Sequence, residues 1–113
     1  MIRSISAKNI CIGDDVFSQT IALTNDVVIK DWPQKPVSEL AEADFAALLD
    51  ANPEIIVLGT GPGNIFAPRE LVFAMARRGI GFEVMNSAAA ARTFNVLGGE
   101  DRRVAAILYL SDE

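Results

Sequence analysis

The chain has 113 residues and a formal net charge of −5, and 50% of its residues are hydrophobic while 22% are charged. This length supports one hydrophobic core, so we expect residues 1–113 to form a single domain of ordinary globular composition. The negative charge argues against a nucleic-acid partner, because contact with a phosphate backbone needs a basic face. A basic substrate or a protein partner fits this charge better.

Nothing in the sequence indicates export or a membrane span. No segment approaches the roughly 18 consecutive apolar residues of a membrane-spanning helix, and the first ten residues lack the apolar core of a signal peptide. The single cysteine, Cys11, cannot form an internal disulfide, which agrees with a reducing compartment. We therefore expect a soluble, cytoplasmic protein in which Cys11 is a small buried side chain rather than a reactive thiol.

The first third of the chain has the composition of β structure. Residues 16–23 and 27–32 are rich in β-branched and aromatic side chains, and residues 24–26 between them have turn chemistry. This pattern predicts an antiparallel hairpin, with Ile10–Ile12 as an additional strand before it. Pro33 ends the pairing, because proline lacks the backbone donor that a strand needs.

A helix is predicted next, from near Ser38 to Asn52-Pro53, because apolar residues recur at helical spacing and acidic residues lie near its start. The following segment, Ile55–Leu58, is continuously apolar, which is typical of a strand covered on both faces. We expect this strand at the centre of the sheet.

The second half of the chain alternates helices and strands. Pro68 suits the first turn of a helix that ends before Gly79, a residue suited to a left-handed cap. A strand over residues 82–85, a helix over 87–97 and a strand over 104–110 complete the pattern. The result is an α/β domain with a mixed sheet, formed by an N-terminal antiparallel hairpin and a C-terminal βαβαβ half with helices packed on the sheet.

The expected core contains Phe45, Leu48, Ile56, Val57, Leu71, Met75, Val84, Phe94, Leu97, Ala106 and Leu108.

Two strands of this pattern open directly into turns that should meet. If they are parallel neighbours, the turn Gly59–Gly61 faces Asn86 and Ser87 at the carboxyl edge of the sheet, where α/β proteins bind ligands. The turn lacks the lysine of a Walker loop and the third glycine of a dinucleotide fingerprint. A tight structural turn is therefore favoured, although the backbone amides of Gly61 and Gly63 could still form a small anion-binding concavity. Because the strand must turn sharply before the next helix, we expect a positive φ at Gly59 or Gly61.

The third helix adds two polar candidates, Arg92 and Asn95, on one face with the small residues Ala88 and Ala91. Together they could bind a carboxylate or phosphate beside the amide end that Ser87 opens. Equally, Arg92 could pair with Glu100 while Asn95 holds the turn after the helix. The candidate ligand-binding set is Gly59, Thr60, Gly61, Asn86, Ser87, Arg92 and Asn95.

Catalytic chemistry has little support in these residues. The chain has no histidine, which excludes Ser-His-Asp and Cys-His arrangements, and zinc would have to rely on Cys11 and carboxylates. Asp14-Asp15 is a solvated turn, because successive strand residues point apart. We predict no catalytic residue, no metal and no cofactor, so a non-enzyme is favoured.

Three segments, EIIVLGTGPG, LVFAMARRGIGFEVMNSAAAARTFNVL and GEDRRVAAILYL, resemble a small family of unknown molecular function that includes the mitochondrial respiratory complex I assembly factor three. The upstream VVIKDWP also fits, since a tryptophan closes the N-terminal hairpin in that family. The resemblance spans nearly the whole chain and implies a compact α/β domain with a mixed sheet. Where this chain has Asn86-Ser87 the family more often has aspartate and threonine, which argues against a mechanism that needs a carboxylate at position 86. The family's pattern falls on Gly59, Thr60, Gly61, Glu83, Met85, Ala89, Arg92, Thr93, Asn95, Leu97, Glu100 and Arg102.

Two functions are consistent with these observations. The first is a non-catalytic binding or assembly-factor-like protein that holds a protein partner at or beside the cleft, linked by resemblance to respiratory complex assembly. The second is a module for a small anionic ligand, or a weak enzyme, that uses the Gly59–Gly61 turn, the Ser87 amide and Arg92.

Overall fold

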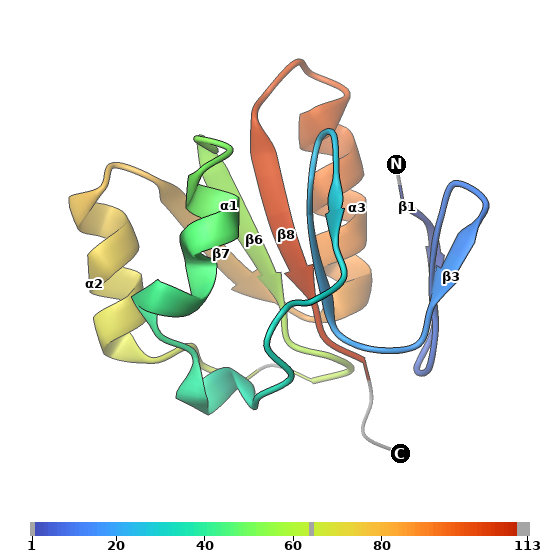
Figure 1. Ribbon diagram of the computed structural model, residues 1–113, viewed down its shortest axis with the longest axis horizontal. Helices are drawn as coiled ribbons and strands as arrows, with labels where there is room; N and C mark the ends of the chain where they lie inside the picture. The colour runs from blue at the N-terminus through green and yellow to red at the C-terminus, as the bar shows by residue number, and fades with distance from the viewer. Residues whose placement is uncertain (1, 64, 111–113) are drawn as a thin grey trace.

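A computed structural model of the protein describes residues 2–63 and 65–110, which form an α/β fold with two sheets (Figure 1). The larger sheet has five strands in the order β5-β4-β8-β6-β7. β6 runs parallel to β7 and β8, whereas β4 is antiparallel to β5 and β8, so the sheet is mixed as predicted. Its strands are β4 (Ile21–Thr24), β5 (Val28–Ile29), β6 (Ile55–Gly59), β7 (Gly81–Met85) and β8 (Val104–Leu108).

The centre of the sheet is β8 rather than β6, which corrects the position expected for Ile55–Leu58. All five residues of β8 are buried, and all residues of β6 except Ile55 are buried as well. Both strands are continuously apolar because helices cover the two faces of the sheet. The last strand of the chain therefore lies between β4 and β6 and joins the antiparallel half to the parallel half.

Different helices cover the two faces of the larger sheet (Figure 1). α3 (Ser87–Gly98) lies on one face, while α1 (Ala46–Leu49) and α2 (Arg69–Arg77) lie on the other with two 3-10 turns, η1 (Val37–Glu39) and η2 (Glu42–Phe45). These turns and α1 replace the single helix predicted from near Ser38. The chain starts a new turn because the Asp44 carboxylate accepts a hydrogen bond from the Ala41 amide (2.9 Å). Within the described ranges, no helix is both long and apolar enough to cross a bilayer.

The first strand predicted for the hairpin is wrong as a single element. Residues 16–23 are divided at a bend over residues 18–20 between β3 (Asp15–Phe17) and β4, because the polar Ser18-Gln19-Thr20 segment interrupts the apolar pattern. β3 joins β2 (Ile10–Ile12) and β1 (Ile2–Ile5) in a separate antiparallel sheet of three strands. β2 confirms the additional strand, whereas the sequence pattern predicts no element at β1.

The small sheet packs on α3 beside the larger sheet (Figure 1), and its Ile2 and Ile10 share one core with Ile21 and Leu23 of β4. Ala90 and Phe94 are buried in the core that α3 shares with the larger sheet. Asn95 holds β1: its Oδ1 accepts from the Ile2 amide (3.0 Å) and its Nδ2 donates to the Ile2 carbonyl (2.8 Å). The small side chain of Ala91, which is also buried, permits this approach, so the helix is covered on two sides.

The predicted core is buried except at two positions. Val84 is 37% exposed, because it lies in β7, which is an edge strand of the larger sheet. Leu97 is only partly buried, and packs against the core at the end of α3. Phe94 is 4% exposed, which confirms the face assigned to it.

We predict that Asn95→Ala lowers the free energy of unfolding by about 1–3 kcal/mol, because both backbone groups of Ile2 lose their partner at a partly buried position. Chemical denaturation followed by circular dichroism measures the change. Asn95→Asp keeps the acceptor but not the donor, and its free energy of unfolding should fall between those of the wild type and Asn95→Ala. Equal stability of all three would mean that the amide does not hold β1.

Candidate functional site

The carboxyl ends of β6 and β7 lie together, as the sequence predicts, and one side chain ties them to the end of β8. Ser87 Oγ accepts from the Gly61 amide (2.8 Å) and donates to the Tyr109 carbonyl (2.6 Å). The Ser87 amide donates to the Gly61 carbonyl (2.8 Å). Three segments distant in sequence are thus fixed by one buried serine, and the amide expected to face an anion is already bonded.

Two further polar side chains of the turns also make hydrogen bonds within the protein. Asn86, rather than Ser87, caps α3, because its Oδ1 accepts from the Ala89 amide (2.8 Å). Thr60 is 3% exposed, and its hydroxyl donates to the Gly63 carbonyl (2.6 Å). These contacts give both turns a structural role.

The two glycines of the first turn serve different purposes. Gly61 has φ +88°, which confirms that one of them adopts a conformation that other residues avoid. Gly59 is not in that region, but a Cβ there would lie 2.8 Å from Ser87 Cα and 3.0 Å from Ala90 Cβ. Gly59 is therefore required because the first turn of α3 packs directly on its Cα.

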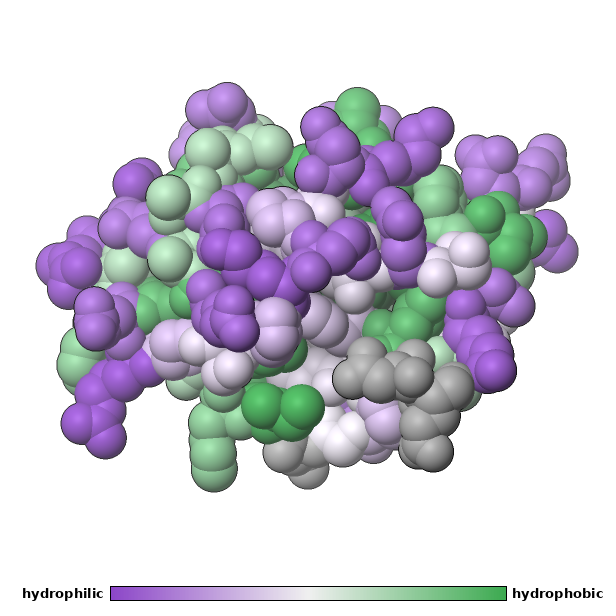
Figure 2. Space-filling view, turned by 60° about the horizontal axis from the view of Figure 1, so that its bottom comes forward, coloured by the Kyte–Doolittle hydropathy of each residue, from purple (hydrophilic) through white to green (hydrophobic). Residues whose placement is uncertain are grey.

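A hollow of about 420 Å³ opens above this junction. A second hollow of about 650 Å³ adjoins it and shares Pro62, Tyr109 and Leu110 with it. Figure 2 brings this edge of the molecule forward and shows apolar and polar side chains interspersed on it. We call the two hollows together the carboxyl-edge cleft. The first is lined by Ile5, Ser6, Ala7, Gly61, Pro62, Asn86, Ser87, Ala88, Tyr109 and Leu110. The second adds Thr20, Gln34, Lys35, Pro36, Val37, Thr60, Gly63 and Ile65.

The seven candidate residues do not converge on one hollow. Gly61, Asn86 and Ser87 line the first, Thr60 lines the second, and Gly59 lies beneath α3. Arg92 and Asn95 line neither.

Arg92 and Asn95 differ in what they contact. Arg92 is exposed, and within residues 2–63 and 65–110 it forms no ion pair, so the expected alternative of a bridge to Glu100 is not formed either. Asn95 binds the backbone of β1 rather than the turn that follows α3.

Sequence reasoning missed part of the lining. Tyr109 and Leu110 follow β8, and because β8 is parallel to β6 its end has to lie at the same edge. That signal was present in the predicted order of elements. The contribution of Ile5, Ser6 and Ala7 had no such signal, because it depends on the packing of β1 against α3.

Tyr109 lines both hollows of the cleft, and the protein alters the ionisation of its side chain. Burial raises the pKa of its phenol to about 12. The hydroxyl donates to the Lys35 carbonyl (2.7 Å). Lys35 in turn pairs with Asp44 (3.0 Å), so its charge is partly neutralised. Among the residues that the structure describes, no three cysteine or acidic side chains gather closely enough to hold a metal ion.

Comparison with known proteins gives one family and several relatives. The family described as "Protein of unknown function (DUF498/DUF598)" matches residues 2–109. The mouse protein named NADH dehydrogenase (ubiquinone) 1 alpha subcomplex assembly factor 3 is 33% identical over 110 residues, which are 95% of this chain and 58% of that protein. The "13 kDa major membrane protein" of Francisella tularensis is 32% identical over 72 residues, which are 64% of this chain and 58% of that one. The chain thus spans little more than half the length of these curated relatives.

A solved structure has the same fold. The NMR structure of a Xanthomonas campestris protein superposes with a TM-score of 0.89 at 35% sequence identity, and the match covers 97% of this chain and 83% of the other.

We predict that Gly59→Ala lowers the free energy of unfolding by about 1–3 kcal/mol, because the added methyl group meets the backbone of α3. Gly63→Ala is the matched control, since a Cβ at Gly63 meets nothing within 4 Å. Urea denaturation of the three proteins measures the difference. If the two variants are equally stable, α3 does not depend on close approach at Gly59.

A second prediction concerns pH. The folded pKa of Tyr109 lies above its ordinary value of 10.0, so the stability that the neutral phenol contributes is complete below about pH 10 and is lost as the pH rises through about 12. Tyr109→Phe should not show this loss of stability as the pH rises from about 10 to about 12. Chemical denaturation of both proteins at several alkaline pH values measures the difference. Because the chain has one tyrosine, absorbance at 295 nm titrates this residue alone, and a midpoint near 10 would contradict the prediction.

Proposed function

The chain belongs to the DUF498/DUF598 family of proteins of unknown function, and from that premise we propose that it is a non-catalytic binding protein that holds a protein partner at the carboxyl-edge cleft, in the manner of an assembly factor. The composition of the cleft lining is the observation that carries this proposal. The hydroxyl groups of Ser87 and Thr60 and the Oδ1 atom of Asn86 are bonded within the protein. What the cleft offers is mainly apolar surface and backbone, which suits a polypeptide segment better than a reacting substrate.

Exposed apolar side chains beside the cleft support the same proposal. Ile65, which lines the second hollow, is 50% exposed, and its neighbour Phe66 is 96% exposed. By contrast, Phe45, Phe94 and Trp32 are each at most 4% exposed. A partner that covers the second hollow would remove Ile65 from water, and a large exposed apolar side chain at the rim of a hollow is typical of a binding surface.

The names of the relatives favour a protein partner over other classes. The mouse relative is named as an assembly factor of an NADH dehydrogenase subcomplex, and it matches 95% of this chain. We extend that role to this chain as a proposal, including a link to respiratory complex assembly. We also propose a cytoplasmic location, which the unpaired Cys11 favours, while one relative is named as a membrane protein.

The alternative of a small anionic ligand has less support from the geometry. Among the described residues, none that lines the first hollow is an arginine or lysine, and Lys35 in the second is paired with Asp44. A thermal-shift screen with phosphate, citrate and nucleotides distinguishes the two functions, since a ligand at 100 times its dissociation constant stabilises a protein by about 2.7 kcal/mol. Stabilisation of that size would favour the alternative.

We predict that Ala88→Glu and Phe66→Ala each abolish or strongly reduce partner capture without unfolding the protein. Glutamate at position 88 places a charge in the lining of the first hollow, and the second position of α3 tolerates an acidic residue because of the helix dipole. Phe66→Ala removes the most exposed of the large apolar side chains in the described ranges and should change stability by about 0.5 kcal/mol or less. Quantitative affinity purification from the native host measures the bound partner.

Ala76→Glu is the matched control, because Ala76 is exposed on α2 and lines neither hollow of the cleft. The proposal requires one and the same protein to be retained by the wild type and by Ala76→Glu and to be lost from both cleft variants. Retention of every captured protein by Ala88→Glu and Phe66→Ala would contradict it.

A further inference from the structure

A different surface lies at the opposite end of the larger sheet, where β6 and β8 begin. Arg102 and Arg103 precede β8, Glu54 precedes β6, and Arg78 follows α2. These residues border a hollow of about 470 Å³, which we call the arginine hollow. Its lining is Leu49, Asn52, Pro53, Glu54, Arg78, Gly79, Ile80, Arg102 and Arg103, so it brings three arginines together with one carboxylate.

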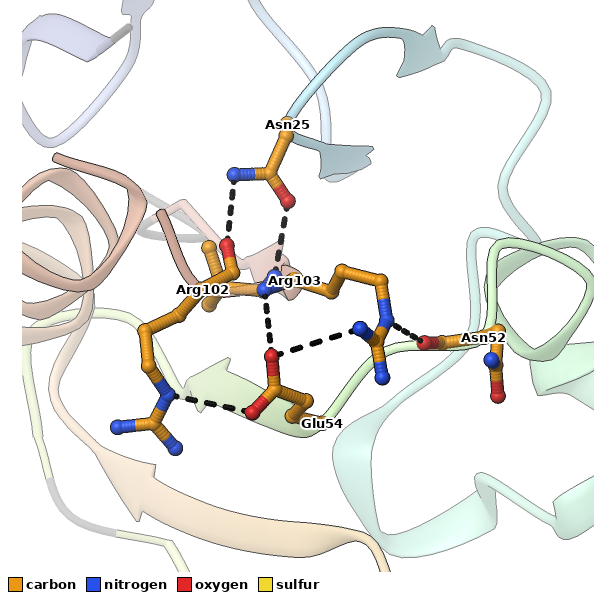
Figure 3. A network of polar contacts seen from close by, with 6 residues as sticks. Asn25, Asn52, Glu54, Arg102 and Arg103 are labelled. Carbon is orange, nitrogen blue, oxygen red and sulfur yellow. Dashed lines mark hydrogen bonds and ion pairs between the residues drawn. The ribbon is translucent and has the colours of Figure 1, made fainter. Parts of the chain in front are cut away.

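Glu54 is fully engaged by the two arginines that precede β8 (Figure 3). Its Oε2 accepts from the Arg103 amide (3.1 Å) and lies 3.8 Å from Arg103 Nη1, while its Oε1 lies 3.5 Å from Arg102 Nε. The hydrogen bond from the Arg103 backbone is the main cause that lowers the pKa of Glu54, and the two guanidinium charges add to it. Arg78 pairs with a second carboxylate, Glu42 (2.7 Å), so the three guanidinium groups exceed the two paired carboxylates by one positive charge.

Donor groups remain available on the arginines. Arg102 contacts Glu54 through Nε, and Figure 3 shows its two terminal nitrogens directed away from that carboxylate. Arg78 donates from Nε to Glu42 (2.7 Å). Within residues 2–63 and 65–110, the terminal nitrogens of Arg78 and Arg102 make no hydrogen bond. Their side chains are 47% and 43% exposed, so an incoming anion can reach both.

The backbone that carries Arg102 is fixed in place. Asn25 Nδ2 donates to the Arg102 carbonyl (3.0 Å), a contact between two residues labelled in Figure 3. Asn25 Oδ1 accepts from the Val104 amide (2.9 Å). Arg103 Nε donates to the Asn52 carbonyl (2.8 Å). A site whose arginines are held by such contacts loses less conformational freedom when it binds.

We propose that the arginine hollow binds aspartate or glutamate side chains of a protein segment. Guanidinium groups bind carboxylates through paired hydrogen bonds, and an acidic segment complements a local positive charge on a chain whose net charge is −5. The lining is mainly polar, whereas sites for ring-bearing metabolites are mainly apolar. The inference rests on the proposed function only in taking the partner to be a protein, and it assigns that partner a second contact at the edge opposite the cleft.

The test is fluorescence anisotropy at low salt with a fluorescein-labelled hexaglutamate peptide and the folded full chain. The wild type should bind, and binding should weaken as salt is added, because half-exposed charges are screened. Arg102→Gln should weaken binding about threefold, which is the size expected for one exposed ion pair. Arg78→Gln should weaken it in the same direction but less, since Glu42 already holds part of that guanidinium.

Two controls separate specific binding from bulk charge. Arg92→Gln removes the same charge from α3, which does not contribute to the hollow, and should bind like the wild type. Arg102→Lys keeps the charge without the guanidinium fork and should lie between the wild type and Arg102→Gln. Melting curves verify that each variant is folded, and a neutral Gly/Ser peptide with the same dye should not bind.

The inference is overturned if the wild type does not bind hexaglutamate, or if Arg92→Gln weakens binding as much as Arg102→Gln and Arg78→Gln do. Phe66→Ala should leave hexaglutamate binding unchanged, although it should lose the partner at the cleft. A chain that fails the peptide assay but loses its partner in Phe66→Ala would refute the arginine hollow and leave the proposed function standing.

Discussion

The close packing of α3 on Gly59 is the constraint on which the rest of the structure depends. Any side chain at this position would collide with Ser87, so only glycine lets the helix begin directly against the end of β6. That proximity lets Ser87 Oγ reach both the Gly61 amide and the Tyr109 carbonyl. The ends of β6, β7 and β8 are thereby fixed at one edge, and α3 is held where β1 can pack on its other side.

The same contacts determine what each edge of the larger sheet can do. At the carboxyl edge, backbone and hydroxyl groups satisfy one another, so the cleft keeps apolar walls beside Ile65 and Phe66. At the opposite edge, the segments before β6 and β8 bring charged side chains together around Glu54. The larger sheet thus presents apolar surface at one end and guanidinium groups at the other, and these are the two surfaces that we propose for a protein partner.

The sequence predicted the parallel half of the fold well, because continuous apolar strands and amphipathic helices carry strong local signals. The positive φ of Gly61 and the meeting of its turn with Ser87 follow from that pattern. The failures depend on non-local packing. Val84 is exposed because β7 is an edge strand, and neither the division of residues 16–23 between two sheets nor the use of Asn95 to hold β1 can be inferred from spacing along one helix or strand.

Site-specific photo-crosslinking in the native host is the most direct test of the claim that a protein partner binds at the carboxyl-edge cleft. A photoreactive phenylalanine analogue replaces Phe66 beside the cleft or, for comparison, Phe73, which is 53% exposed on α2. The account predicts a discrete crosslinked partner from position 66 and none from position 73. A crosslink from position 73 with none from position 66 would contradict it and move the binding surface to the outer face of α2.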